Sequence, residues 1–382
     1  MIYIVVAVYI ISYLTCRSNS LLTTLYAINL QASTFEIGMM QGLVALFPMI
    51  FAVYAGRVSD RYGYRYPFVL GSFGICLALL LPYLVKGKIF ILYISQLIYG
   101  LSFIFLLVNM QNLVGGLSTA ETRSQNYAIY SLGVSIANFF GPLVTGFTID
   151  YIGYNKTYLI LAILAATAGL LMLINVIKLP LPKLQEQEHK NNVGELLASK
   201  SLRKIFITSG IILIGVGIYE FYFPIYGERL GFSASIIGFL LSINAAAFFL
   251  VRFGMPWLVS KFGENTVFIS CLLVSACAFF ILPLFGSIPT LAFGSFIVGL
   301  SLGCGQPLSM VMAYSASPLG RTGEVLGVRL TVNKTVQFFV PIIFGSVGTL
   351  VGALPIFWAN TLMMIGGSFY MFKDKKNKIT SR

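Results

Sequence analysis

The sequence has little charge of either sign and few acids. Of its 382 residues 10% are charged, whereas soluble proteins carry roughly 25%. Hydrophobic residues make up 58%, and the mean hydropathy is +0.88. A soluble core of this size would not hide so much apolar surface, so the composition excludes an ordinary soluble domain. It predicts a polytopic membrane protein.

The sequence also has few histidines, and its cysteines do not form clusters. The one histidine is His189, and the five cysteines lie inside apolar runs without metal-ligand spacing. We therefore expect no zinc, haem or other cofactor, and thiols that pack as small hydrophobes. No G-x-x-x-x-G-K-[ST] stretch occurs, which argues against nucleotide-driven transport. With no histidine in an apolar run, we find no nucleophile–base pair for a membrane-embedded enzyme.

Long apolar runs are abundant instead. A helix needs about 20 apolar residues to cross the hydrocarbon core. The first run is too long for a signal peptide, and we expect it to be the first retained span. Ser33 and Glu36 predict a capping box that opens the second span. Such runs predict twelve spans, at 3–29, 35–57, 66–85, 89–114, 124–149, 156–178, 204–229, 234–259, 265–285, 288–315, 324–349 and 353–372.

A polar segment in the middle divides these runs into six and six. We predict a fold of the all-α integral membrane class, with twelve transmembrane helices in two six-helix bundles related by a pseudo-two-fold axis. The boundaries are 1–180 for the first bundle, 181–203 for a cytoplasmic linker, 204–373 for the second bundle and 374–382 for a basic tail. An offset of 200 residues supports the division, because Tyr26, Leu30, Ser33, Ile37, Gly38, Ala45 and Gly63 match Tyr226, Leu230, Ser233, Ile237, Gly238, Ala245 and Gly263.

The net charge of +13 does not indicate nucleic-acid binding, because the basic residues are dispersed in short polar segments. Most lie on one side of the predicted membrane. The other side holds Lys86, Lys88, Lys156 and Arg229. By the positive-inside rule we expect a multi-pass plasma-membrane protein with both termini in the cytoplasm.

One polar stretch carries a motif, Gly56-x-x-x-Asp60-Arg61-x-Gly63-x-Arg65. It lies between the second and third runs, where we expect a short polar loop. The pattern Gly56-x-x-x-Asp60-x-x-Gly63-Tyr64 recurs 90 residues later as Gly146-x-x-x-Asp150-x-x-Gly153-Tyr154, and a degenerate copy runs from Pro256 to Gly263. Three spans separate the first two copies, so we expect them on opposite sides of the membrane, as in inverted repeats.

Twelve spans, the central linker and this motif together resemble the major facilitator superfamily over essentially the whole chain. The resemblance implies a secondary transporter whose two bundles rock about a central site, with Gly56, Asp60, Arg61, Gly63 and Arg65 as a gating latch. Two features depart from the family pattern. Gln96 replaces the arginine implicated in proton transfer in the fourth span, and the antiporter run is partial, with Gly141, Pro142 and Gly146.

Ionisable side chains inside spans are costly and are functional candidates by default. Arg17 and Lys334 are expected to line a cavity, or to have structural partners. Glu220 is a proton carrier or an ion-pair partner, and Arg252 a substrate contact or a gating residue that reaches the interface. Further polar candidates for substrate or coupling contacts, or for helix packing, are Asn19, Asn109, Tyr222, Gln306, Asn333 and Gln337.

Three cations in the spans against Glu220 as the deep acid predict a positively charged cavity, which favours an anionic substrate. We predict a monomeric secondary transporter that works by alternating access and exports a small organic anion or amphiphile, such as a carboxylate siderophore or drug, with possible proton coupling. The alternatives are an importer or facilitator of a small metabolite and a transporter-like lipid scramblase or receptor.

Overall fold

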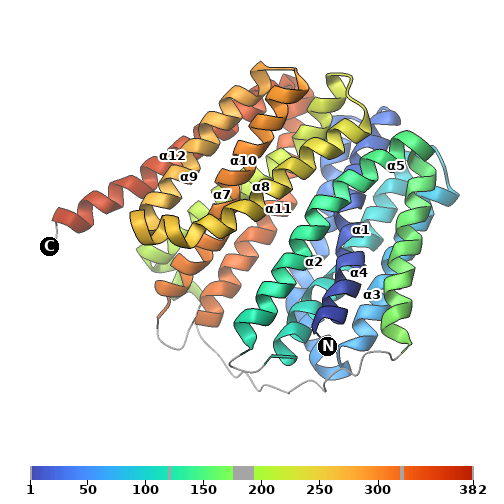
Figure 1. Cartoon of the computed structure of the whole chain (residues 1–382), viewed down its shortest axis with the longest axis horizontal. Helices are drawn as coiled ribbons and strands as arrows, with labels where there is room; N and C mark the ends of the chain where they lie inside the picture. The colour runs from blue at the N-terminus through green and yellow to red at the C-terminus, as the bar shows by residue number, and fades with distance from the viewer. Residues whose placement is uncertain (1, 119–121, 175–192, 319–321, 381–382) are drawn as a thin grey trace. The chain divides into compact units, whose positions relative to one another are not determined.

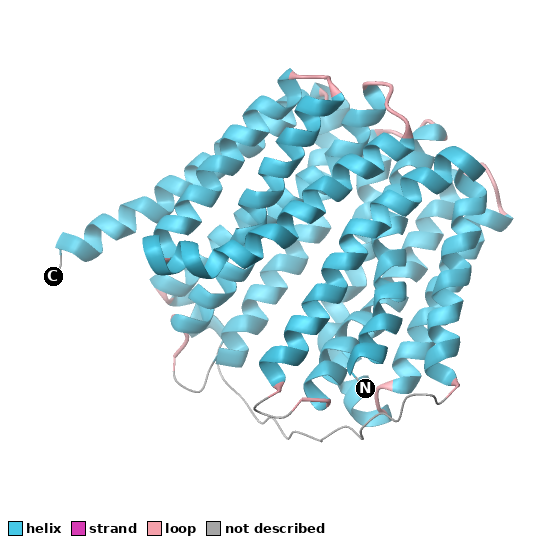
Figure 2. Ribbon diagram, viewed as in Figure 1, coloured by secondary structure: helices cyan, strands magenta, loops and turns pink. Residues whose placement is uncertain are grey.

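The computed structural model describes residues 2–118, 122–174, 193–318 and 322–380. Helices joined by short connections make up these segments (Figure 1). No strand occurs among the described residues (Figure 2). Within some helices a few side chains are not described, and those of Arg57 and Asp60 are among them. The predicted all-helical class is confirmed.

The helices follow the predicted spans closely. In the first half they are α1 (Ile2–Asn29), α2 (Thr34–Tyr62), α3 (Arg65–Leu84), α4 (Ile89–Gly116) and α5 (Arg123–Leu173). In the second half they are α6 (Val193–Ala198), α7 (Lys200–Arg229), α8 (Ala234–Phe262), α9 (Glu264–Ile281), the 3-10 turn η1 (Leu282–Leu284), α10 (Ile288–Ser315), α11 (Thr322–Val351) and α12 (Leu354–Thr380).

Ten helices among the described residues are long and apolar enough to cross a membrane. One of them, α5, holds two predicted spans, 124–149 and 156–178, on either side of a kink at Gly153. A further predicted span, 353–372, lies in α12. The chain thus has about ten to twelve helices that can span a membrane, in agreement with the prediction.

The predicted loop at the Gly56–Arg65 motif is wrong. Helix α2 continues through Tyr62, so Gly56, Asp60 and Arg61 lie on its last turns. Only Gly63 and Tyr64 form the connection to α3. The prediction placed a loop here because the residues are polar. A helix that extends beyond the membrane keeps its backbone hydrogen bonds, however, and its side chains there can be polar. The capping box of Ser33 and Glu36 at the start of α2 is confirmed.

Each copy of the motif ends in a glycine with the same backbone conformation. Gly63, Gly153 and Gly263 have φ angles of 78°, 81° and 77°. Gly352, with φ 79°, ends a fourth copy that the sequence reading missed, Gly345-x-x-x-Thr349-x-x-Gly352. Residues with a side chain are strained at such positive φ angles, which glycine adopts freely. The four positions therefore share the motif spacing and a positive φ, which Gly87 and Gly231 also adopt at other connections between helices.

Contacts between Cα atoms group the chain into two compact units. One comprises Met1–Gln187 and Gly227–Ser242, and the other comprises Glu188–Tyr226 and Ile243–Arg382. In the first unit α1 and α3 pack on α5, while α4 packs on α2 and α3. In the second unit α9 packs on α10 and α12. The predicted domain boundaries at 180 and 203 stay a prediction, and much of the linker between them falls outside the described residues.

Candidate functional site

Arg17 lies in the middle of α1, and its guanidinium contacts a neutral amide. Its Nε donates a hydrogen bond of 2.5 Å to Oδ1 of Asn138 on α5. The guanidinium carbon also lies 5.9 Å from the ring centroid of Tyr13, within the range of a cation–π interaction. Residue 17 is about 22 Å along α1 at 1.5 Å per residue, far from both helix ends. The structure therefore places a cation deep in the first unit.

A second polar network surrounds Asn19, and it is fully buried. Asn19 donates to Gln96 at 2.9 Å, and the Gln96 amide donates to Thr23 at 2.9 Å. The Thr23 hydroxyl lies 3.1 Å from the hydroxyl of Tyr158. These bonds tie α1 to α4 and α5. Gln96, at the position where the family pattern has arginine, is thus a packing partner of Asn19, which leaves the proposed ligand role of Asn19 a prediction.

Asn109 on α4 contacts the predicted gating motif. Its Oδ1 accepts from the Ser59 hydroxyl at 2.7 Å, and its Nδ2 donates to the backbone carbonyl of Tyr64. Ser59, Tyr64 and Asn109 are buried. Arg61 is exposed and lies over the ring of Tyr62, with 5.5 Å between the guanidinium carbon and the ring centroid. One buried amide therefore clamps the end of α2 and the turn that follows.

The small residues of α5 bring two neighbouring helices close. A Cβ added at Gly141 would lie 2.7 Å from Cβ of Arg17, and one at Gly146 would lie 2.9 Å from Cα of Ser235 in α8. Gly238 of α8 in turn lies against the carbonyl of Pro142. All these residues belong to the first unit, which includes α8 up to Ser242. Backbones can approach this closely only where side chains are absent.

The acid of the second motif copy caps α8. The Asp150 carboxylate accepts hydrogen bonds from the backbone N–H groups of Ala234, at 3.2 Å, and Ser235, at 2.8 Å. These N–H groups belong to the first turn of α8, where helices leave donors unpaired and favour negative charge. Asp150 thus caps the first turn of α8 from a different helix.

In the second unit the predicted residues occupy different environments. Glu220 on α7 and Arg252 on α8 are half-buried. Tyr222 is fully buried, and its hydroxyl donates at 2.6 Å to the carbonyl of Phe344 on α11, which is a packing contact. On α11, Nζ of Lys334 donates at 2.9 Å to the exposed Gln337. Their predicted roles as substrate or coupling residues stay predictions.

A buried arginine that the sequence reading did not single out is the centre of a polar cluster in this unit. Arg329 on α11 is 9% exposed, and its Nη2 donates to the carbonyl of Gln306 at 2.9 Å and to the hydroxyl of Ser309 at 2.8 Å. Ser309 lies 3.4 Å from the hydroxyl of Ser209, which donates to Asn333 at 3.2 Å. The sequence could have indicated this residue, since an arginine inside the apolar run 324–349 is itself unusual.

One hydrogen-bond donor in this polar cluster has no acceptor among the described residues. Nε of Arg329 is buried and makes no hydrogen bond among the described residues. The groups bonded to the guanidinium are a carbonyl and a hydroxyl, both neutral. A hydrophobic cluster of Leu196, Leu202, Ile205, Phe206, Ala313 and Val325 lies nearby, with Val325 one turn before Arg329 on α11. A guanidinium that keeps its charge in such surroundings favours a negatively charged partner.

Membrane-length helices with polar clusters buried among them define a polytopic membrane protein. The sequence profile of the Major Facilitator Superfamily matches residues 5–341 and 205–381. The chain belongs to this family, which is a family of transporters and not an enzyme class.

Relatives agree with this assignment, and a solved structure shares the fold. Multidrug resistance protein 2 of Bacillus subtilis is 23% identical over 355 residues, covering 89% of this chain and 87% of the relative. The quinolone resistance protein NorA of Staphylococcus aureus is 21% identical over 347 residues, covering 87% and 85%. The crystal structure of a mutant of the nucleoside transporter NupG superposes with a TM-score of 0.82 at 15% identity, covering 98% of this chain and 99% of that one.

Proposed function

We propose that this chain exports a small organic anion or anionic amphiphile across the plasma membrane by alternating access. The observation that carries the proposal is the buried guanidinium of Arg329, whose described partners are neutral and whose Nε has no acceptor among the described residues. A carboxylate that accepts from Nε would give this buried donor an acceptor. Such charge-assisted bonds are about twice as strong as neutral ones.

The balance of charges inside the spans also favours a negatively charged substrate. Among the described residues well inside the spans, the first unit carries the basic Arg17. The second unit carries the basic Arg252, Arg329 and Lys334 against the acid Glu220. Sites with an excess of positive charge bind organic anions better than lipophilic cations.

The direction of transport is supported by the names of the relatives, which are resistance proteins for several drugs and for quinolones. A cell resists a drug when the drug leaves faster than it enters. Export against a gradient needs a coupling ion, and Glu220, the half-buried acid on α7, is the candidate proton carrier. The cytoplasmic location of both termini rests on the distribution of basic residues.

Transport into everted membrane vesicles tests the proposal. The test compounds are the anionic quinolone nalidixic acid, its ethyl ester and the lipophilic cation ethidium. We expect energised vesicles with the full chain to accumulate nalidixic acid, and Arg329→Gln to reduce this uptake at least tenfold, since a hydrogen bond to a charged group is worth about 1.5–3 kcal/mol. Uptake of the ester should not change.

Arg229→Gln, at the exposed end of α7, is the matched control and should transport as the wild type does. Arg329→Lys keeps the charge but loses the planar array of donors, and we expect intermediate uptake. Transport of ethidium but not of nalidixic acid, unchanged by Arg329→Gln, would contradict the anionic substrate while leaving the export function intact.

A further inference from the structure

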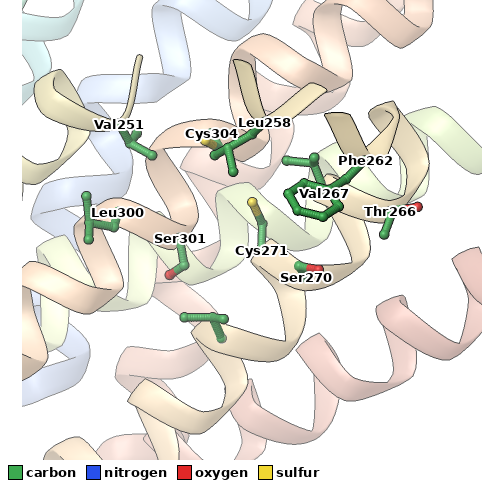
Figure 3. A pocket seen from close by; sticks show the side chains of 11 residues that line it. Val251, Leu258, Phe262, Thr266, Val267, Ser270, Cys271, Leu300, Ser301 and Cys304 are labelled. Atoms are coloured by element: carbon green, nitrogen blue, oxygen red, sulfur yellow. The ribbon is translucent and has the colours of Figure 1, made fainter. Parts of the chain in front are cut away.

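A cavity of about 330 Å³ lies in the second unit, between α8, α9 and α10 (Figure 3). None of the residues that line it is acidic or basic, and two of them are cysteines. The lining residues are Val251, Leu258, Phe262, Thr266, Val267, Ser270, Cys271, Val274, Leu300, Ser301 and Cys304. Nothing in the transport proposal uses this cavity.

The two thiols face each other because of the way α9 and α10 pack. Ser275 of α9 donates to the hydroxyl of Ser301 of α10 at 2.8 Å, which sets the register of the two helices. One turn away on each helix, at positions 271 and 304, both residues are cysteines. Residues three or four apart share a helix face. Cys271 and Cys304 accordingly line the same cavity from adjacent helices, and Figure 3 shows the side chain of Cys271 directed toward Cys304.

The cavity is accessible from the apolar outside of the unit. Phe262 is 50% exposed and Val274 is 45% exposed at its rim, whereas Cys304 is 1% exposed. All three helices are candidate membrane spans, and the exposed rim residues Phe262 and Val274 are apolar. A ligand that fits this cavity would be apolar and uncharged, because a buried charge needs a partner.

We propose that Cys271 and Cys304 form a dithiol site for an apolar compound of trivalent arsenic, with an organic arsenical as the chemical class of ligand. Thiolate sulfur is a soft ligand that selects soft metals and metalloids. The apolar wall would hold the organic group. The volume is sufficient, because a cavity of about 150 Å³ already binds benzene.

The reaction is a ligand exchange without change of oxidation state. An aryl arsenous acid, ArAs(OH)₂, loses two As–OH bonds and gains two As–S bonds. Each thiol proton leaves with one hydroxide as water, so ArAs(OH)₂ and two R–SH give ArAs(SR)₂ and two H₂O. Zinc is a poor alternative, because its structural sites need four nitrogen, sulfur or carboxylate ligands and the lining residues supply two.

Phenylarsine oxide tests the proposal on the purified full chain in lipid nanodiscs. After reduction of the protein, intact-mass spectrometry should show one phenylarsenic group per chain. The adduct should survive an excess of the monothiol 2-mercaptoethanol, because a chelate is lost only when both As–S bonds exchange. The dithiol 2,3-dimercaptopropanol should remove it.

Cysteine variants test whether Cys271 and Cys304 are the two ligands. A chain with Cys16→Ser, Cys76→Ser and Cys277→Ser keeps only the two cysteines of the site and should bind one group, whereas Cys271→Ser or Cys304→Ser should reduce the monothiol-resistant adduct to near zero. Peptide mapping of the wild-type adduct should find residues 271 and 304 bridged, which answers the question even if a variant does not fold. A chain that forms no resistant adduct, or a bridge that maps to other cysteines, would overturn the proposal.

Discussion

The carboxylate of Asp150 accepts a hydrogen bond of 2.8 Å from the backbone N–H of Ser235, the second residue of α8. Eighty-five residues separate the two in sequence. A motif that looks like a local turn signal therefore provides a long-range cap. The carboxylate accepts from backbone N–H groups at the beginning of α8, which would otherwise need water as their acceptor.

Removal of this cap should destabilise the contact between α5 and α8. The loss of an N-cap costs about 0.5–2 kcal/mol, so Asp150→Ala should lower the melting temperature of the purified protein. Asp150→Asn keeps an acceptor and should lower it less. Glu228→Gln, at an exposed position near the end of α7, is the control. Equal melting temperatures for Asp150→Ala and wild type would show that water replaces the cap at no cost.

Gly146 should not tolerate a side chain. A Cβ there would clash with the backbone of Ala234 and Ser235, and backbone cannot move aside as a flexible side chain does. Gly146→Ala should therefore destabilise the protein by about 1–3 kcal/mol, as overpacking does. Gly254 of α8 offers the matched control, since no atom lies within 4 Å of a Cβ built on it. Thermal unfolding of Gly146→Ala and Gly254→Ala side by side gives the comparison.

The motif at the end of α2 should control turnover and not affinity. We expect Asp60→Asn to slow transport with little change in substrate binding. Asn109→Ala should do the same, because it removes the amide that holds Ser59 and Tyr64. Initial uptake rates across a range of substrate concentrations separate the maximal rate from the half-saturation concentration. A rise in that concentration at an unchanged maximal rate would place Asn109 at the substrate instead.

Glu220 should couple transport to the proton gradient. Glu220→Gln cannot release a proton, so it should abolish uptake driven by an imposed pH gradient but leave exchange of labelled for unlabelled substrate intact. Glu264→Gln, which changes an acid at the beginning of α9, should retain both activities. An equal loss of driven uptake and exchange in Glu220→Gln would indicate a structural role for this carboxylate.

Part of the candidate site was predictable from the sequence. Arg17 stood out because an arginine in the middle of an apolar run is rare, and the structure places it deep in α1 with Asn138. Arg329 was missed, although it follows the same rule, because it lies nearer the start of its run. The fourth copy of the motif was also missed, since Gly345 and Gly352 frame a threonine in place of the acid.

The sequence by itself determined where the apolar helices lie and the class of protein. Apolar runs of membrane length can satisfy their backbone only as helices, and this property is local. The tertiary structure alone decided which polar groups meet, such as Asp150 with Ser235 and Arg329 with Ser309. These pairings depend on the rotation of each helix about its axis. That rotation is set by the close packing of residues that are far apart in the chain, such as Gly146 against α8.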